Sequence, residues 1–425
     1  MDMTNNKALR KRAETVLPNG VYGHESTMLL PESYPQFFEK AEGAYIWDAD
    51  GNKYLDFMCA YGPNLLGYGE ERVSRAALDQ LAKGDAMTGP TPLMVELAEV
   101  MTGMISHADW AMFCKNGTDA TTMAKTVARA QTGKRVILVA DGSYHGAVPW
   151  CTPVPTGVIP EDRAYIQTYE YNNADSLAAA AAEAGDDLAG IFATPFKHDA
   201  FTDQMLPDPA YAKKAREICD ETGALLIVDD IRAGFRLARD CSWELIGVRP
   251  DLSTWGKSFA NGHPISALLG SNSARAGAAS IFATGSFWFS AVPMAAAIET
   301  LKILQDTDYL EHITGLGEYL RKGLGQAAEE TGFTLRQTGP AQMPLFLFED
   351  DPDFRIGFAW GEAMLKRGVY VHPWHNMFLC RAMTQADMDL TIEAAKASFL
   401  EVREKLGQLQ PHPLVAAMLY QAAAE

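Results

Sequence analysis

The sequence contains no run of about 18 apolar residues, the length that a helix needs to cross a bilayer. Its first segment, MDMTNNKALRKRAETVLP, is polar and interrupted by charges, so it lacks the apolar centre of a signal peptide. Both features predict a cytoplasmic protein with no membrane association.

Cysteine is scarce and scattered, with six residues in a chain of 425 and no Cys-x-x-Cys pair. That spacing suits neither a zinc site nor a disulfide framework, and we expect reduced thiols in the core and no bound metal. Positively charged residues are also few, since the chain has 36 Lys and Arg against 54 Asp and Glu, and its net charge is −18. Such a balance excludes a protein that neutralises many nucleic-acid phosphates.

The length and the 48% hydrophobic content exceed what one core usually organises. We expect a large domain over residues 76–310 and a smaller α+β domain built from residues 1–75 and 311–425. In the first part, AYIWD and KYLDF alternate in polarity around an Asp-Gly pair, a pattern that predicts a β-hairpin. A short amphipathic helix and an irregular loop should precede this hairpin.

From about Thr91, short apolar runs alternate with helical patterns, which predicts a mostly parallel sheet with helices on both faces. In such an α/β fold, ligands bind at the carboxyl ends of the strands. The last hundred residues contain FTLRQTG, PLFLFED and RGVYVHP and then a helix from Thr384, a pattern that predicts a compact α+β cap.

Two predicted strand ends carry side chains that can take part in catalysis. Asp229 and Asp230 follow the apolar run ALLIV, and Lys257 follows the short run DLSTW. A carboxylate and a lysine at neighbouring strand ends are what pyridoxal phosphate (PLP) chemistry requires: the lysine forms an imine, and the carboxylate keeps the pyridine nitrogen protonated. Either residue alone is more often a solvated charge or a surface salt bridge.

Two further motifs favour the PLP interpretation. Gly117 and Thr118 begin a helical pattern, where free backbone N–H groups and the helix dipole bind a phosphate. An alternative interpretation of these residues is an ordinary helix N-cap formed by Thr118 or Asp119. Tyr144 and His145 follow the run RVILVA and are available to stack on an aromatic ring.

In the order NGTDA, SYHG, VDD, WGK, these motifs resemble the class III aminotransferases of PLP fold type I, from about Val16 to about Leu400. The resemblance implies PLP as cofactor, held as an imine on Lys257, which also shuttles protons, with Asp229 as the partner of the pyridinium. The other implied cofactor contacts are Gly117 and Thr118 at the phosphate, Tyr144 with its neighbour His145 on one face of the ring, and Ile231 on the other face.

The segment TGSFWFSAVPMAAAIETL resembles the family version in which a hydroxyl reaches the phosphate bound by the partner subunit. The resemblance therefore implies a homodimer with shared active sites and Ser286 as a donor in trans. A packed aromatic corner is the simpler explanation of this segment.

Other stretches resemble glutamate-1-semialdehyde aminomutases and amino-sugar aminotransferases, which stay as alternative activities. The aminomutases, however, hold the substrate carboxylate with an arginine near the position of Ser26, and VYGHESTMLLPESY contains none. Because a buried carboxylate without a partner is costly, this loop should disfavour substrates with an acid beside the amine. Thr194-Pro195 also replaces the usual Glu-Pro pair, so a keto-acid acceptor would need a cation, which could be Lys197, Arg232 or Arg381.

Aromatic and methionine side chains are frequent around the expected site, and most are expected to be core residues. Tyr61, Trp288 and Trp374 are candidates for substrate contact beside Arg232. Together with the missing arginine, they favour an apolar amine, and several segments, MCAYGPNLLGY and HADWAMFCKNG among them, resemble bacterial aminotransferases that act on hydrolysed fumonisin.

The sequence therefore predicts a ping-pong transaminase that works through pyridoxamine phosphate. It would move an amino group from an apolar or long-chain primary amine, such as a fumonisin-type aminopolyol, to a keto acid such as pyruvate. An inactive relative or a PLP-dependent regulator is disfavoured, because Lys257 is present and no nucleic-acid-binding domain is appended.

Overall fold

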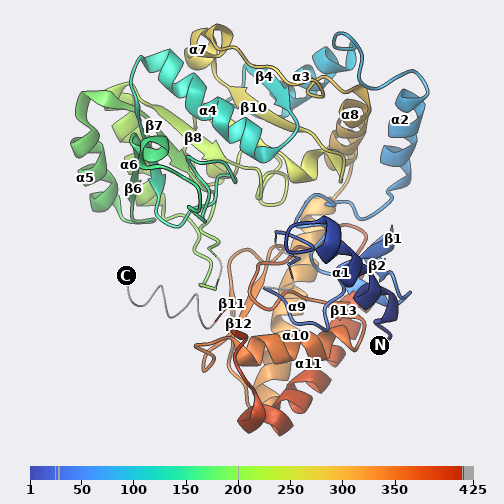
Figure 1. The fold of residues 1–425 in the computed structure, drawn as a ribbon. Coiled ribbons are helices and arrows are strands. Elements are labelled where there is room, and N and C mark those ends of the chain that lie inside the picture. The colour runs from blue at the N-terminus through green and yellow to red at the C-terminus, as the bar shows by residue number, and fades with distance from the viewer. Residues whose placement is uncertain (24, 27–28, 200, 414, 416–425) are drawn as a thin grey trace.

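The computed structural model describes residues 1–23, 25, 26, 29–199, 201–413 and 415. Figure 1 shows two parts, an upper one around a large sheet and a lower one that contains elements from both ends of the chain. The expected boundaries at residues 75 and 310 are not tested by this arrangement and stay a prediction.

The upper part is organised by a seven-stranded sheet in the order β4-β10-β9-β8-β7-β5-β6. All neighbouring strands are parallel except β10, which runs antiparallel to both β4 and β9. The predicted mostly parallel sheet is thus confirmed. The strands are β4 (Trp110–Cys114), β5 (Val136–Ala140), β6 (Ile166–Tyr169), β7 (Leu188–Ala193), β8 (Leu225–Asp229), β9 (Leu252–Trp255) and β10 (Ser266–Gly270).

Helices cover both faces of this sheet, as the alternating pattern predicts (Figure 1). In β8, Leu226 and Val228 pack into one core, whereas Leu225 and Ile227 pack into the other. This alternation explains why the central strands are apolar throughout. The helices of this part are α2 (Glu71–Leu81), α3 (Leu93–Met104), α4 (Gly117–Thr132), α5 (Ala174–Ala184), α6 (Pro209–Thr222), α7 (Arg275–Ser280) and α8 (Ala291–Asp306).

The lower part joins the two ends of the chain in a four-stranded sheet, in which β13 (Val369–Tyr370) pairs in parallel with β3 (Lys53–Asp56). The predicted hairpin is confirmed, since β2 (Tyr45–Asp48) and β3 are antiparallel, and Gly51 has a φ of 81° in the turn between them. The remaining elements are α1 (Thr4–Val16), β1 (Phe38–Glu42), α9 (Tyr309–Thr331), β11 (Leu335–Thr338), β12 (Leu345–Phe348), α10 (Arg355–Leu365) and α11 (Gln385–Lys405).

Short 3₁₀ helices complete the fold. They span Pro160–Arg163, Gly185–Asp187, Ser242–Ile246, Lys257–Ala260, Asn272–Ala274 and Leu406–Gln408. None of the helices in the described ranges is long and apolar enough to cross a membrane. All six cysteines are free thiols, and five of them are buried, whereas Cys151 is partly exposed.

A buried arginine connects the two parts. Arg236 is fully buried after β8, and its guanidinium donates to the carbonyls of Leu379, at 2.6 Å, and Gly62, at 2.9 Å. Both acceptors lie on segments that pack against the lower part, so these hydrogen bonds tie segments far apart in the sequence to the end of β8. Burial lowers the pKa of Arg236.

We expect Arg236→Met to lower the free energy of unfolding by about 3 kcal/mol, because two buried carbonyls lose a charged donor. Urea denaturation followed by circular dichroism measures the change. Arg12→Met, at an exposed position of α1, should change stability by less than about 0.5 kcal/mol. Equal midpoints and slopes for the Arg236 variant and the unmodified protein would contradict this role.

Candidate active site

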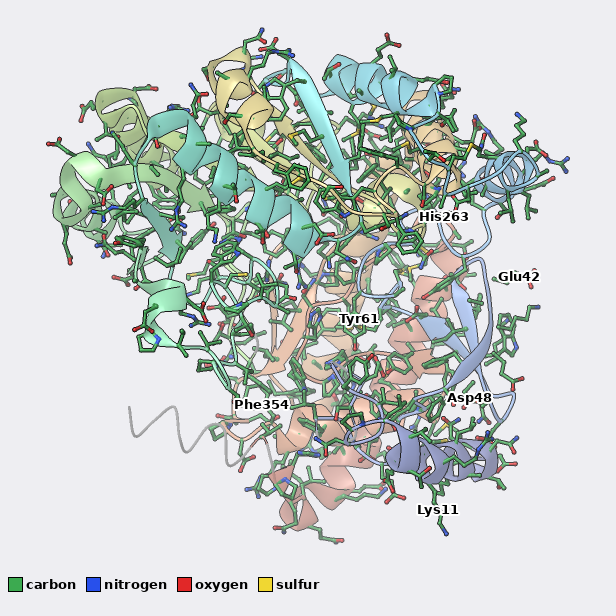
Figure 2. The ribbon with its side chains drawn as sticks, turned by 45° about the horizontal axis from the view of Figure 1, so that its top comes forward. Lys11, Glu42, Asp48, Tyr61, His263 and Phe354 are labelled. Carbon is green, nitrogen blue, oxygen red and sulfur yellow. The ribbon has the colours of Figure 1, made fainter. Side chains whose placement is uncertain are left out.

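A cavity of about 320 Å³ lies at the carboxyl ends of the central strands and collects most of the sequence-predicted residues. Eight of them line it: Gly117, Thr118, Tyr144, His145, Asp229, Ile231, Arg232 and Lys257. The lining also includes His263. Figure 2 labels His263 and also Tyr61, which lies nearer the lower part and does not line this cavity. The parallel strands therefore bring segments from five parts of the sequence to one place, as the switch from strand to loop at each carboxyl end predicts.

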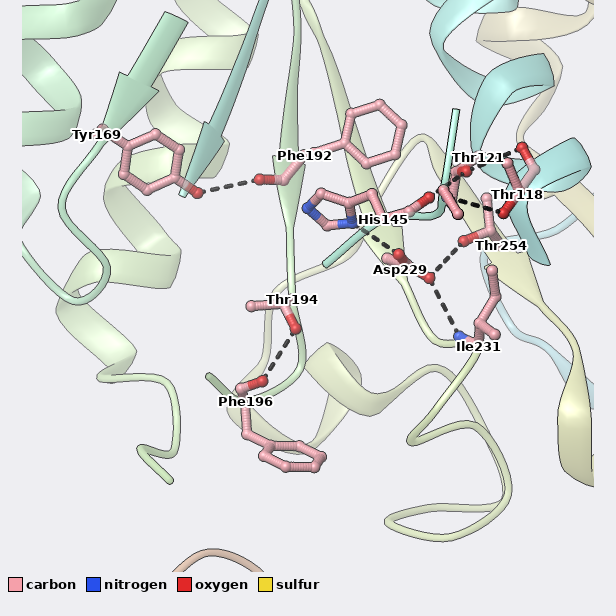
Figure 3. Close-up of polar contacts among 11 residues, drawn as sticks. Thr118, Thr121, His145, Tyr169, Phe192, Thr194, Phe196, Asp229, Ile231 and Thr254 are labelled. Atoms are coloured by element: carbon pink, nitrogen blue, oxygen red, sulfur yellow. Dashed lines mark hydrogen bonds and ion pairs between the residues drawn. The ribbon is translucent and has the colours of Figure 1, made fainter. Parts of the chain in front are cut away.

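Asp229, the last residue of β8, is buried and held by three donors (Figure 3). Its Oδ1 accepts hydrogen bonds from Thr254 Oγ1, at 2.9 Å, and from the backbone N–H of Ile231, at 3.3 Å. Its Oδ2 lies 2.7 Å from His145 Nδ1. The carboxylate is consequently fixed in direction at the floor of the cavity. Asp230, the next residue, points away and accepts hydrogen bonds from Ser242.

His145 positions Asp229 and is itself enclosed. Its imidazole ring lies 5.0 Å from the ring of Phe192 and is stacked on Trp150 at 6.5 Å, and its carbonyl accepts a hydrogen bond from Thr121. Tyr144, in contrast, is 42% exposed and lines the cavity. The ring of His145 thus packs on Phe192 and Trp150, whereas the ring of Tyr144 remains available to stack on a cofactor.

Lys257 begins a short 3₁₀ helix after β9, with a φ of 46° in the left-handed region. Such a conformation is uncommon for a lysine and is typical of functional sites. Its stem packs against Gly62, where an added Cβ would lie 3.2 Å from Lys257 Cδ. Burial, and next the positive charge of Arg232, lower the pKa of the amine to about 8. An amine with this pKa is partly unprotonated near neutral pH, as a nucleophile and base must be.

The start of α4 forms a close-packed turn against the cavity. An added Cβ at Gly117 would lie 2.7 Å from Ile231 Cδ1, so a larger residue there would force the Ile231 side chain to move. Asn116 is the N-cap, and its backbone N–H donates to Asp119 Oδ2 at 3.0 Å. Thr118 is therefore not the N-cap. Gly117 and Thr118 both line the cavity, and N–H groups of a first helical turn have no acceptor within the helix.

Four predicted residues lie outside this cavity. Ser286 is exposed, and Trp288 is partly buried in a core cluster behind the sheet. Trp374 is buried and stacks on Phe201 at 4.7 Å. Tyr61 donates to Glu25 and lies 5.3 Å from the ring of His375.

Tyr61 instead borders a second cavity of about 420 Å³, together with Glu25, Asp56 and Tyr370. Glu25 belongs to the early loop that lacks arginine, of which residues 24, 27 and 28 are outside the described ranges. Its two carboxylate oxygens accept hydrogen bonds from Tyr61 and Tyr370, and burial raises its pKa.

Sequence reasoning missed two residues that matter here. Thr254 binds Asp229 because the two are register partners of adjacent strands, and strand alternation alone does not reveal a partner strand. His198 follows β7 and lines the cavity, and burial holds the pKa of its imidazole well below the ordinary value. Its place after the strand LAGIFA was the available signal, since the other strand ends carry site residues too.

The residues present fit PLP. The cavity offers an amine on Lys257, a fixed carboxylate on Asp229, and a helix that begins at Gly117, where the backbone packs closely on Ile231. These are the groups that would meet the aldehyde, the ring nitrogen and the phosphate of that cofactor.

Comparisons with known proteins agree with this chemistry. The chain is 58% identical to an aminopentol aminotransferase of Sphingopyxis macrogoltabida over 97% of its own length and 98% of that protein. It is 33% identical to a 3-aminobutyryl-CoA aminotransferase of Cloacimonas acidaminovorans, over 96% and 99% of the two chains. A glutamate-1-semialdehyde 2,1-aminomutase of Heliobacterium modesticaldum is 32% identical, over 91% and 94%.

A solved structure of the PLP internal aldimine form of the FumI protein of Sphingopyxis sp. MTA144 superposes with a TM-score of 0.96 at 58% identity, covering 97% of this chain and all of that one. An omega-transaminase from Sphaerobacter thermophilus gives a TM-score of 0.83 at 25% identity, over 94% and 98%. The model of the class-III aminotransferase family matches residues 30–396. The resemblance found in the sequence motifs is confirmed, and the chain belongs to the class-III aminotransferases.

Proposed function

We propose that this chain is a PLP-dependent transaminase that moves an amino group from an apolar or long-chain primary amine to a keto acid such as pyruvate. The observation that carries the proposal is the placement of Lys257 and Asp229 in one cavity at neighbouring strand ends, in a chain that belongs to the class-III family. The activity proceeds in two half-reactions, one for each substrate.

Lys257 Nζ would hold the aldehyde of PLP, Asp229 its ring nitrogen, and the first turn of α4 its phosphate. Ile231 and Tyr144 would flank the ring, with His145 holding Asp229 in place. Bound there, PLP supplies an electron sink for the carbon that carries the amino nitrogen. Lys257 Nζ takes the proton from that carbon and later returns it, and its pKa of about 8 suits transfer in both directions near neutral pH.

The donor preference is inferred from the early loop. Where a carboxylate receptor is expected from the aminomutases, the structure has Glu25, whose oxygens accept hydrogen bonds from two tyrosines. A donor carboxylate next to this group would meet like charge, and Lys40, a cation that borders the same cavity, is already paired with Glu42 at 2.6 Å. Tyr61 and Tyr370 add aromatic walls. An aminopolyol of the fumonisin type fits these features, and the relative named aminopentol aminotransferase supports it.

We also propose that the protein is a cytoplasmic homodimer with shared active sites, with domains divided near residues 75 and 310. The segment 281–290 supports the dimer, because Phe282 is 93% exposed and Phe287 is 63% exposed on either side of Ser286. Large exposed aromatic side chains in one segment are typical of an interface. Ser286 would then reach the phosphate bound by the other subunit.

Lys257→Ala should lower kcat/KM for amino transfer by at least about 10²–10⁴-fold, because both the covalent anchor and the proton carrier are lost. Steady-state assays with amine and pyruvate measure this, and circular dichroism checks that the fold is kept. Lys83→Ala, at an exposed position of the upper part, is the matched control and should retain full activity. Turnover by the Lys257 variant near the unmodified rate would refute the assignment.

The rate at which cofactor-free protein takes up PLP covalently should rise with pH around a midpoint near 8. Only the unprotonated amine reacts, and burial with the charge of Arg232 lowers the pKa of Lys257 from 10.5 to about 8. Stopped-flow absorbance across pH 6–10 follows the reaction. A midpoint above pH 10 would mean that the amine is not perturbed.

A panel of amine donors, followed by bleaching of the bound cofactor, tests the substrate class. We expect long-chain aliphatic amines to react with a higher kcat/KM than α-amino acids of similar length, because the early loop offers Glu25 and no arginine. Chiral and mass analysis with and without pyruvate separates transamination from aminomutase chemistry. Faster reaction of the α-amino acids would overturn the donor assignment and leave the family unaffected.

A further inference from the structure

Arg232 is a half-buried cation on the wall of the proposed active site. It follows Ile231, and its Nη1 donates to Asn376 Oδ1 and to His375 Nε2, the latter at 3.3 Å. Its guanidinium also lies 5.9 Å from the ring of Phe378. Segment 375–378 thus holds one end of the guanidinium in place.

This guanidinium makes no ion pair with any carboxylate in the described ranges, and no hydrogen bond from its Nη2 or Nε is seen there. Burial lowers its pKa to about 10. Both of its hydrogen-bond partners are neutral, and a buried charge that forms no ion pair is costly, a cost that an anionic ligand would offset. The planar fork of arginine pairs best with a carboxylate or a phosphate.

Of the other cations near the cavity, one forms an ion pair, two donate to backbone carbonyls and one is exposed. Lys197 Nζ is 3.1 Å from Asp199 Oδ2, and Lys115 Nζ donates to the carbonyl of Pro264 at 3.0 Å. Arg236 donates hydrogen bonds to the carbonyls of Leu379 and Gly62. Arg381 is exposed and does not line the cavity. Of the three cations that the sequence left open, only Arg232 lines the cavity.

The proposed phosphate cradle and Arg232 occupy different elements. The cradle is the first turn of α4, where Gly117 packs against Ile231, whereas Arg232 is held by residues 375 and 376 from the C-terminal part of the chain. An anion on Arg232 is therefore a second one, distinct from the cofactor phosphate. In a transaminase, that second anion is the carboxylate of a substrate.

We propose that Arg232 binds the carboxylate of the keto-acid acceptor, with Asn376 and His375 positioning its guanidinium. The inference rests on the proposed transaminase function, because it names the group that admits the second substrate. It also explains how a site without an arginine in its early loop accepts both a donor that has no carboxylate and an acceptor that has one.

Transamination is reversible, so the acceptor and the product formed from it bind at the same place. The amino acid formed from the acceptor is the donor of the reverse half-reaction, so alanine must use the same receptor as pyruvate. Bleaching of the bound cofactor by alanine should then depend on Arg232 much more than bleaching by a long-chain amine, which shares with alanine only the effect of Arg232 on the pKa of Lys257.

The test compares Arg232→Gln with the unmodified holoenzyme in separate half-reactions. Loss of a charged hydrogen-bond donor should lower kcat/KM for alanine and for pyruvate by about 10- to 100-fold. With a long-chain amine, kcat/KM should fall much less than with alanine, because the effect of the Arg232 charge on the pKa of Lys257 is common to all substrates, so the ratio of the two rates isolates carboxylate binding. The reaction with the amine also shows that the variant is folded and loaded. Arg232→Lys should recover part of the loss, and Arg381→Gln, at the exposed position, should behave as the unmodified enzyme.

A binding measurement adds a readout that does not depend on turnover. Calorimetric titration of the holoenzyme with propionate, a carboxylate without a reactive carbonyl, should give a Kd that rises about 10-fold or more in Arg232→Gln. Unchanged affinity for propionate, or an equal loss of rate with amine and with alanine, would overturn the proposal, the second result placing Arg232 with the cofactor. Absence of all amino transfer in the unmodified enzyme would instead overturn the proposed function.

Discussion

Three strand ends converge on the carboxylate of Asp229, and the geometry of the site depends on their convergence. β8 supplies the carboxylate, β9 supplies Thr254, and the loop after β5 supplies His145. Asp229 and Thr254 are register partners in the parallel pair, so a one-residue slip would turn one of them to the opposite face. The buried core on each face of the sheet prevents that slip. The packing of apolar residues outside the cavity therefore fixes the positions of Asp229 and Thr254 within it.

The cavity carries an excess of positive charge, although the whole molecule is negatively charged. The chain carries a net charge of −18, yet the cavity is lined by three cations, Lys115, Arg232 and Lys257, and by one carboxylate, Asp229. Confined like charges repel strongly, and this repulsion together with burial makes the amine of Lys257 reactive. The same excess of positive charge suits anions, namely a phosphate and a substrate carboxylate, and an acidic exterior is compatible with it because water screens the distant surface charges.

The main features of the fold and the principal site residues could be predicted from local signals. Apolar strands followed by polar residues marked Asp229 and Lys257, and a glycine before a helix marked Gly117, because each signal depends on a few consecutive residues. The antiparallel direction of β10 could not be predicted, since a short apolar run has no direction of its own. Trp374 and Trp288 were chosen for their residue type, but aromatic side chains fill cores as readily as they line sites, and here both pack inside.

By itself, the sequence determined that this is an α/β chain with a lysine and a carboxylate at adjacent strand ends, and that its early loop lacks an arginine. Those properties are local, so composition and order suffice to reveal them. Only the tertiary structure decided between Lys197, Arg232 and Arg381, because pairing is a property of space: Asp199 neutralises one, solvent surrounds another, and segment 375–378 holds the third at the cavity wall. It likewise decided that Glu25 meets Tyr61, from a later turn of the N-terminal part, and Tyr370 of β13, since the second contact forms only when the two ends of the chain fold together.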